Sequence, residues 1–496
     1  MEPEYSKLSE SLVDFTPNLQ TIKKSALHSI IMQLFFKLKG IIAMPIITYF
    51  LLPEELGIYN LIIITASLLT PIFSLNLTDG PAILLVQEKS HEKIKDIHST
   101  VINSALIFYF IFSWLFFLAM SITDNYLNKF SLLIIFVIFA NLIYKLFSYV
   151  LAVFQKTSIL VKNTFIKDTV TVVLSIILIM VGFSYFGMLF ALIMSNLVAT
   201  HFIYSCIKRD LPYRLYLDMK MLIDLLKLAL PLLPVFIFSW IIQSSDNYFI
   251  AYFMGEGAVG RYNIIYSLCS VILSLTLALN FFWFPVSAKL WVTDRVSYQK
   301  AFENIFSLAF FILLTGVLFF ELNSENLVWI FARNKEYQSS YIIMGIIAIA
   351  FSMQVLITLL TAPLYSNRNI NAIFLSYLAG GIFNCVLNLL LIPSIGIFGA
   401  SISTALSYIA VVSMMIFLNY KVAEFKFIDK RLKFVLAIFI IFWALIFYIR
   451  ENLGTKQILL TNIPLLLIVG SLFYFIGLTK EERKLILVTY KNFRNN

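Results

Sequence analysis

Four apolar stretches of this 496-residue chain carry polar side chains at helical spacing. A charge at the centre of a bilayer is unfavourable by about 2.5–3.5 kcal/mol on insertion scales, so such residues usually face a cavity or a partner. In each stretch the polar residues are four positions apart, which places them on one helix face. The residues are Gln33 and Lys37, Asn141 and Lys145, Gln243 and Asn247, and Asn384 and Asn388. We predict that these residues line a substrate cavity.

The charges expected at membrane depth are Lys37, Lys39, Lys145 and Asp246, and lysines predominate. A cationic cavity suits an anionic substrate, because a phosphate without counter-charge is strongly destabilised in a low dielectric. We expect Asp246 to pair with one of the lysines or to serve as a coupling-ion site. Lys39 lies about 200° around its helix from Lys37, and the sequence leaves open whether it lines the cavity or packs at a helix contact.

The polar and charged residues in the apolar stretches do not all need a functional role. The Asn and Gln side chains could simply join helices, because amides commonly form hydrogen bonds between membrane helices. Asp168 is expected at the end of a span, where a charge needs no functional explanation. The first half of the chain is therefore expected to hold buried lysines and no carboxylate at mid-membrane.

Other reactive residue types form no recognisable site. The cysteines Cys206, Cys269 and Cys385 lie within apolar runs and are expected to be packing residues. The four histidines make no metal-ligand pattern; they are His28, His91, His98 and His201. No hydrolase, P-loop or dinucleotide motif occurs in a supporting context. The sequence therefore predicts no metal site, no cofactor and no enzyme, although a transporter could couple to protons or sodium.

The hydropathy pattern shows which elements must position these residues. Sixty per cent of the residues are hydrophobic, 13% are charged and the mean hydropathy is +0.89, whereas a soluble domain has about 25% charged residues. The apolar residues fall in runs of about twenty, the length of a helix that crosses a bilayer. The chain is therefore predicted to be an all-α integral membrane protein with about 14 transmembrane helices. The predicted spans are 26–50, 57–77, 99–121, 130–154, 166–185, 187–207, 225–252, 258–286, 301–320, 339–362, 371–392, 397–419, 433–450 and 458–478.

The distribution of basic residues gives the orientation. When residues at span ends are counted with the adjoining loop, 27 of the 37 Lys and Arg residues lie on one side of the predicted membrane and 6 on the other. Basic residues concentrate on the cytoplasmic side of membrane proteins. Both termini are therefore predicted to be cytoplasmic. The net charge of +10 reflects these loops, and no nucleic-acid partner is expected.

An internal repeat organises the spans. The turn YFLLPEELGIYNLI, from Tyr49 to Ile62, aligns without a gap to YFMGEGAVGRYNII, from Tyr252 to Ile265, at an offset of 203 residues. A weaker match pairs Gly187 and Ala191 with Gly396 and Ala400. Parallel repeats about an axis along the membrane normal are a transporter architecture. We predict two six-helix lobes related by a pseudo-twofold axis, a C-terminal helix pair and two cytoplasmic tails. The ranges are 1–25 for the N-terminal tail, 26–207 and 225–419 for the lobes, 433–478 for the helix pair and 479–496 for the C-terminal tail.

Several ordered motifs resemble the polysaccharide repeat-unit flippases of the multidrug/oligosaccharidyl-lipid/polysaccharide exporter (MOP) superfamily. The stretches that carry the resemblance are PIITYFLLPEELGIYNLI, LPLLPVFIFSWIIQSSDNYFIAYFMGEGAVGRYNIIYSL and GGIFNCVLNLLLIPSIGIFGASISTALSY. The family's helix-7 Asp falls on Asp246, its Gly-x-Tyr turn on Gly260 and Tyr262, and its helix-11 Asn pair on Asn384 and Asn388. The resemblance extends over roughly 26–478.

The resemblance implies a flippase of the bacterial inner membrane that works by alternating access. Its substrate would be an undecaprenyl-diphosphate-linked oligosaccharide for O-antigen, capsule or a related surface polysaccharide, and a polymerase and chain-length machinery would be its partners. The alternatives are a multidrug/cation antiporter of the same superfamily, a peptidoglycan-precursor flippase and, less favoured, a membrane polymerase or glycosyltransferase. A monomer is expected because each chain supplies both lobes. The sugars, the coupling ion and its stoichiometry are not readable from the sequence.

Overall fold

The computed structural model describes a helical membrane protein. The described residues are 39–78, 85, 88, 90–122, 126–154, 156–209, 211–423, 430–452 and 471. They form helices and loops without a strand, and ten of these helices are long and apolar enough to cross a membrane. Two shorter apolar helices, Lys39–Phe50 and Val435–Ile446, accompany them. The predicted all-α membrane fold is confirmed, while most of the predicted spans 26–50 and 458–478 lies outside the described residues.

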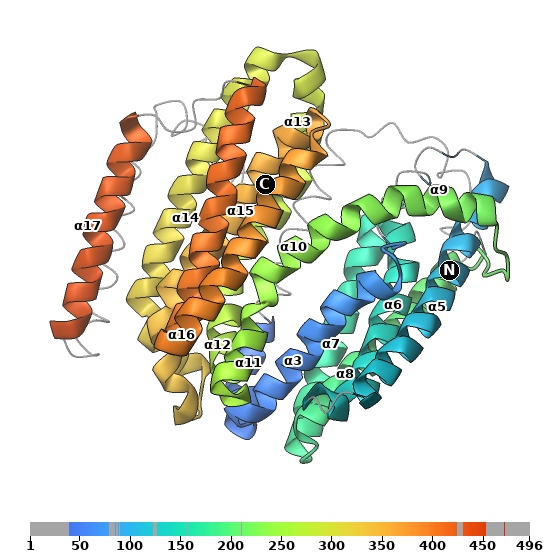
Figure 1. Cartoon of the computed structure of the whole chain (residues 1–496), viewed down its shortest axis with the longest axis horizontal. Coiled ribbons are helices and arrows are strands. Elements are labelled where there is room, and N and C mark those ends of the chain that lie inside the picture. Colours follow the sequence, from blue (N-terminus) through green and yellow to red (C-terminus); the bar gives the residue numbers. More distant parts are fainter. Residues whose placement is uncertain are drawn as a thin grey trace, which may run out of the picture. The chain divides into compact units, whose positions relative to one another are not determined.

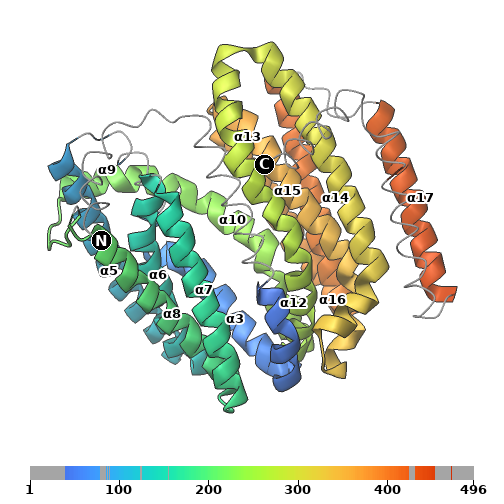
Figure 2. The same ribbon diagram turned by 180° about the vertical axis from the view of Figure 1, so that it is seen from behind.

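The chain divides into two compact units, residues 1–260 and 261–496. In the first unit α6 packs against α3 and α8, and α7 packs against α8, so that these helices run side by side (Figures 1 and 2). The helices of this part are α3 (Pro53–Phe73), α5 (His91–Ile122), α6 (Ser131–Val153), α7 (Thr157–Met180) and α8 (Ser184–Ile207), with the 3-10 helix η1 (Tyr126–Phe130) before α6. The predicted lobe boundaries, 26–207 and 225–419, stay predictions.

The predicted span 225–252 is broken into shorter helices. Pro231 and Pro234 lie at the breaks, where proline removes a backbone donor and its ring clashes with the preceding turn. A second break falls at Ser245, where a turn separates two helices. The segments are α9 (Met219–Ala229), η2 (Leu230–Leu232), α10 (Leu233–Ser244) and α11 (Asp246–Met254). The described fold groups these helices with the first unit.

Helix α7 begins nine residues earlier than the sequence predicted, at Thr157 instead of 166. The polar residues at its start are typical of a loop, but two of them form hydrogen bonds to neighbouring helices. Asn163 donates a hydrogen bond to the Ala199 carbonyl of α8 at 3.1 Å. Asp168 therefore lies in the middle of an apolar helix and not at a span end, which corrects the expectation that the first half of the chain lacks a carboxylate at mid-membrane.

The second unit is also a helical bundle, in which α15 packs against α14 and α16. Its helices are α12 (Glu256–Cys269), which begins in the first unit, η3 (Ser270–Leu273), α13 (Ser274–Thr293), α14 (Arg295–Phe331), η4 (Lys335–Ile343), α15 (Met344–Ser366), α16 (Ile370–Ala423) and α17 (Lys430–Asn452). Helix α16 combines two predicted spans that meet at a kink. There Ile395 leaves the helical region and Gly396 takes a φ of +61°, a conformation that glycine adopts readily.

The two copies of the strongest repeat contact each other reciprocally within the first unit. A Cβ on Gly57 would lie 1.9 Å from the carbonyl oxygen of Glu256, and a Cβ on Gly260 would lie 2.0 Å from the carbonyl oxygen of Pro53. The same offset of 203 relates Gly57 to Gly260 and Pro53 to Glu256. Reciprocal contact between equivalent residues is the pattern of a twofold interface. Two copies of one motif make such reciprocal contacts when they pack face to face.

Local geometry repeats as well. The rings of Tyr49 and Phe50 lie edge to face with centroids 5.0 Å apart, and those of Tyr252 and Phe253 lie edge to face at 4.9 Å. The weaker match behaves differently, because Gly396 supplies a positive φ whereas Gly187 permits a close approach to the Leu178 side chain. The two glycines of that match therefore have different structural roles.

Candidate functional site

Five helices of the first unit enclose a cavity of about 470 Å³. This volume falls within the range of small-molecule pockets, about 300–1,000 Å³. The lining residues come from α3 (Ser67, Thr70), α6 (Asn141, Tyr144, Lys145), α7 (Lys167), α8 (Asn196) and α10 (Phe236, Trp240, Gln243, Ser244). All of these helices carry apolar membrane-length sequences. The cavity is therefore a polar space among hydrophobic elements.

Helical periodicity explains why these residues converge. On α10 the lining residues occupy positions i, i+4, i+7 and i+8, which form one face of a helix. On α6 the positions i, i+3 and i+4 are Asn141, Tyr144 and Lys145. Each helix turns one polar stripe toward the cavity and leaves its other faces for packing or lipid.

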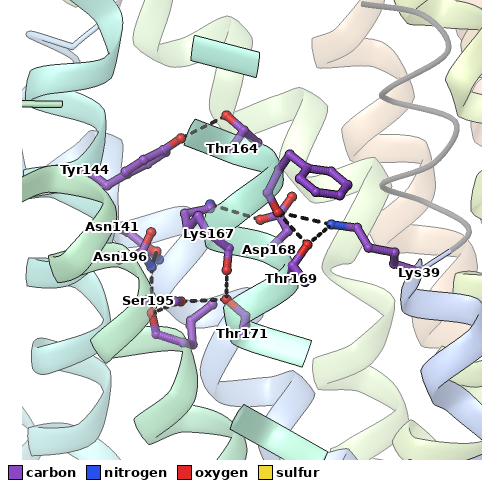
Figure 3. Close-up of polar contacts among 12 residues, drawn as sticks. Lys39, Asn141, Tyr144, Thr164, Lys167, Asp168, Thr169, Thr171, Ser195 and Asn196 are labelled. Atoms are coloured by element: carbon purple, nitrogen blue, oxygen red, sulfur yellow. Dashed lines mark hydrogen bonds and ion pairs between the residues drawn. The ribbon is translucent and has the colours of Figure 1, made fainter. Parts of the chain in front are cut away.

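The charged lining residues are both lysines. Among the described residues, no Asp or Glu lines the cavity. Lys167 has its Nζ 3.4 Å from Oδ1 of Asp168 and 4.3 Å from the ring centre of Tyr144, and Figure 3 shows it beside both. The described part of the chain gives Lys145 no such ion-pair partner. The cavity thus presents two ammonium groups, and within the described ranges only that of Lys167 has a carboxylate partner.

Hydrogen bonds between helices fix the polar walls. Asn196 Nδ2 donates to Asn141 Oδ1 at 3.1 Å and joins α8 to α6. The hydroxyls of Tyr144 and Thr164 lie 3.0 Å apart and join α6 to α7 (Figure 3). Trp240 Nε1 donates to Ser67 Oγ at 3.0 Å and joins α10 to α3. Polar groups that are held in place in this way can bind a ligand without a large loss of side-chain freedom.

The structure places the predicted site residues in different parts of the molecule. Asn141, Lys145 and Gln243 line the cavity together. Gln33 and Lys37 lie outside the described residues.

Asp246 and Asn247 are buried beside each other at the start of α11 and do not line this cavity. The Asp246 carboxylate accepts hydrogen bonds from the backbone N–H and the side-chain amide of Asn247, both at 2.9 Å. The amide of Asn247 also donates to the Ser244 carbonyl at 3.2 Å. These contacts show how the acid is held, while its expected role at a coupling-ion site stays a prediction.

Asn384 and Asn388 lie in the second unit and are fully buried. Asn388 Nδ2 donates to Asn384 Oδ1 at 3.0 Å, and Ser403 Oγ donates to the Asn384 carbonyl at 3.1 Å. Ser403 follows the kink in α16, so the second contact ties the two halves of α16 together. The two amides thus bind each other within one helical segment, and a cavity role for this pair stays a prediction.

Lys39, whose position the sequence left open, contacts α7. Its Nζ donates to the Phe165 carbonyl at 3.2 Å and to Thr169 Oγ1 at 2.7 Å, and it lies 4.1 Å from the Phe165 ring centre (Figure 3). Lys39 is not among the residues that line the described cavity. It therefore packs at a helix contact, which is one of the two roles considered for it.

Sequence reasoning missed several lining residues, most notably Lys167, Asn196, Tyr144 and Trp240. A signal for Tyr144 was present, because it lies between Asn141 and Lys145 on the same stripe. Lys167 was obscured by the late predicted start of its helix. Asn196 and Trp240 carried no signal of their own, because a single amide or indole in an apolar run is common at helix contacts.

Removing the hydroxyl of Tyr144 should weaken the contact between α6 and α7. We expect Tyr144→Phe to lower the free energy of unfolding by about 0.6–1.5 kcal/mol, since one hydrogen bond between membrane helices contributes about this much. Thermal unfolding of the purified protein in detergent measures the change. Tyr252→Phe is the matched control because Tyr252 is 83% exposed. An equal loss of stability in both variants would contradict the assignment.

A comparison with protein-family models identifies the family of this chain. The model of a family described as polysaccharide biosynthesis protein matches residues 22–291, which is more than half of the chain. The chain belongs to the polysaccharide biosynthesis protein family. The matched region contains every residue that lines the cavity. No curated protein sequence matches the chain.

Solved structures show that the fold is that of known membrane transporters. The lipid II flippase MurJ in an inward closed conformation matches with a TM-score of 0.70 and 15% identity, over 90% of this chain and 99% of that chain. An inward-facing multidrug resistance MATE family transporter of the MOP superfamily matches with a TM-score of 0.58 and 14% identity, over 78% and 95%. A MOP superfamily transporter from Pyrococcus furiosus matches with a TM-score of 0.57 and 14% identity, over 83% and 97%. The chain is therefore a multi-pass membrane protein with the MurJ and MATE fold.

Proposed function

We propose that this protein is a flippase that moves undecaprenyl-diphosphate-linked oligosaccharides from the cytoplasmic to the periplasmic leaflet of a bacterial inner membrane. The observation that supports this most is the cavity with Lys145 and Lys167 on its wall and no carboxylate among its described lining residues. A diphosphate carries several negative charges, and transfer of such a group into a low-dielectric membrane requires nearby positive charge. The two ammonium groups supply it.

The remaining lining residues suit a sugar. Asn141, Asn196 and Gln243 present amides, each of which can donate to and accept from sugar hydroxyls. Trp240 and Phe236 add apolar ring surface to the same cavity. The lipid tail would stay in the bilayer, so the protein would need to enclose only the diphosphate and the sugars. Family membership in polysaccharide biosynthesis supports the same class of substrate.

The cavity also bears on the rival functions. A multidrug/cation antiporter would need an acidic cavity in the first unit. Asp168, a carboxylate in the middle of α7, is paired with Lys167 and lies outside the lining. A peptidoglycan-precursor flippase remains the second candidate, because its substrate is also a prenyl diphosphate and the fold matches a lipid II flippase. A polymerase or glycosyltransferase is less favoured, since transport alone accounts for the cavity.

Orientation and energy coupling belong to the same proposal. The charge bias of the predicted loops supports an orientation with both termini in the cytoplasm. A proton or sodium gradient would drive net export, with Asp246 as the coupling-ion candidate. A polymerase and chain-length machinery would remove the product, and the protein would act as a monomer.

Deletion of the gene in its native host tests the proposal. We expect lipid-linked repeat units to accumulate facing the cytoplasm and surface polysaccharide to disappear, with recovery when the wild-type gene is restored. Lectin or antibody labelling of everted and right-side-out vesicles measures the leaflet in which the units accumulate. Normal surface polymer after deletion, in a host without a second copy, would contradict the oligosaccharide substrate. Loss of viability that a known lipid II flippase rescues would instead favour the peptidoglycan precursor.

A further inference from the structure

Asp168 lies next to the cavity but does not line it, and it is close to two lysines. Its Oδ1 is 3.4 Å from Nζ of Lys167, which does line the cavity. On the other side of Asp168 lies Lys39, whose Nζ is held on the same helix by Thr169 at 2.7 Å (Figure 3). The carboxylate therefore lies between two ammonium groups.

Lys167 is held so that it can exchange partners. Its ammonium group lies 4.3 Å from the ring centre of Tyr144, and its side chain is only 18% exposed. The ring of Tyr144 is itself fixed by the contact with Thr164 at 3.0 Å. A cation between an aromatic face and a carboxylate is attracted to both. A small shift toward the cavity would leave the cation beside Tyr144 and release the carboxylate.

The charge balance permits this exchange. If Lys167 left Asp168 for an anion in the cavity, a carboxylate with no positive charge nearby would be destabilised among the apolar helices. Lys39 lies on the other side of Asp168 and does not line the cavity, so it remains to balance the carboxylate. An incoming anion would also meet Lys145, which has no ion-pair partner among the described residues.

We propose that Asp168 is an internal competitor for the anionic headgroup: Lys167 leaves Asp168 to bind the substrate diphosphate and returns to it on release. This inference rests on the proposed function and adds a positioning residue to it. Asp168 sets the affinity below the maximum that the two lysines would give. A transporter needs this property, because a substrate that binds too tightly is released slowly.

Binding of farnesyl diphosphate to the purified full-length protein in detergent tests the proposal, with farnesol as the uncharged control. Asp168→Asn should lower the Kd for farnesyl diphosphate by about two- to fivefold, as expected from the loss of a partly exposed ion pair. The same variant should export less surface polymer, because release becomes slower. A structural defect would weaken both binding and export, so the opposite movement of the two readouts is decisive.

Three further variants and a matched control complete the design. Lys167→Gln should weaken binding, and adding Asp168→Asn to it should bring no gain in affinity. Asp168→Glu keeps the carboxylate and should retain wild-type export. The matched control is Asp224→Asn, which breaks a Lys–Asp pair of 2.9 Å with Lys227 on α9, outside the cavity, and it should leave the Kd unchanged.

The outcomes separate the two proposals. Wild-type binding with an unchanged or higher Kd in Asp168→Asn would overturn the exchange and leave the flippase proposal in place. A gain in affinity that persists without Lys167 would also overturn the exchange. Failure of the wild type and of every variant to bind farnesyl diphosphate would overturn both.

Discussion

Replacing Lys145 by Glu should reduce export of surface polysaccharide by about 100-fold or more. The change removes the cavity lysine that has no ion-pair partner among the described residues and puts a negative charge in its place. A hydrogen bond to a charged group contributes about 1.5–3 kcal/mol, and repulsion of the diphosphate adds to that loss. Since every 1.4 kcal/mol is a factor of ten, two orders of magnitude are expected. Quantifying surface polymer in a deletion strain that carries the variant measures the effect.

Controls for this charge reversal are available in the chain. Lys145→Arg keeps the charge and should retain most export. Lys227→Glu reverses a lysine whose side chain is 69% exposed on α9, and it should have little effect. The amount of each variant in the membrane must be equal for the comparison. Full export by Lys145→Glu at normal abundance would remove Lys145 from the substrate pathway and, with it, the main support for an anionic substrate.

Adding one methyl group at the reciprocal turn contact should disrupt the protein. In Gly57→Ala the new Cβ would lie 1.9 Å from the Glu256 carbonyl oxygen, and in Gly260→Ala it would lie 2.0 Å from that of Pro53. Both obstacles are backbone atoms, so one helix end must shift by about 1 Å for a normal contact of roughly 3 Å. Overpacking of this kind reduces stability by about 1–3 kcal/mol and sometimes more. Thermal unfolding in detergent measures the loss.

The twofold character of the contact gives this prediction a sharper form. Because the two glycines occupy equivalent places, each single variant should lose a similar amount of stability. Once either substitution has separated the helix ends, the second has less contact left to break, so the double variant should lose less than the sum. Gly316→Ala is the control, because nothing lies within 4 Å of its added Cβ. Strictly additive losses would show that the two contacts are independent.

The sequence alone determined the class of the protein and much of its organisation. Runs of about twenty apolar residues predict membrane helices because the bilayer offers no other partner for backbone polar groups. The repeated turn was readable because its Tyr, Phe, Gly, Tyr, Asn and Ile residues recur at one offset of 203. Asn141, Lys145 and Gln243 could be chosen as cavity candidates because polar residues at helical spacing are costly in lipid unless they face water or a partner.

Tertiary structure decided which polar stripes meet. Asn384 and Asn388 have the same spacing as the cavity residues, yet they bind each other beside the kink in α16. Lys39 is as polar as Lys145, but its hydrogen bonds bind it to α7. Lys167 and Asp168 lie at the edge of a predicted span, whereas in the structure their helix begins at Thr157 and Asn163 donates a hydrogen bond to α8. Spacing along one helix fixes a face, whereas the partner of that face depends on residues far away in the chain.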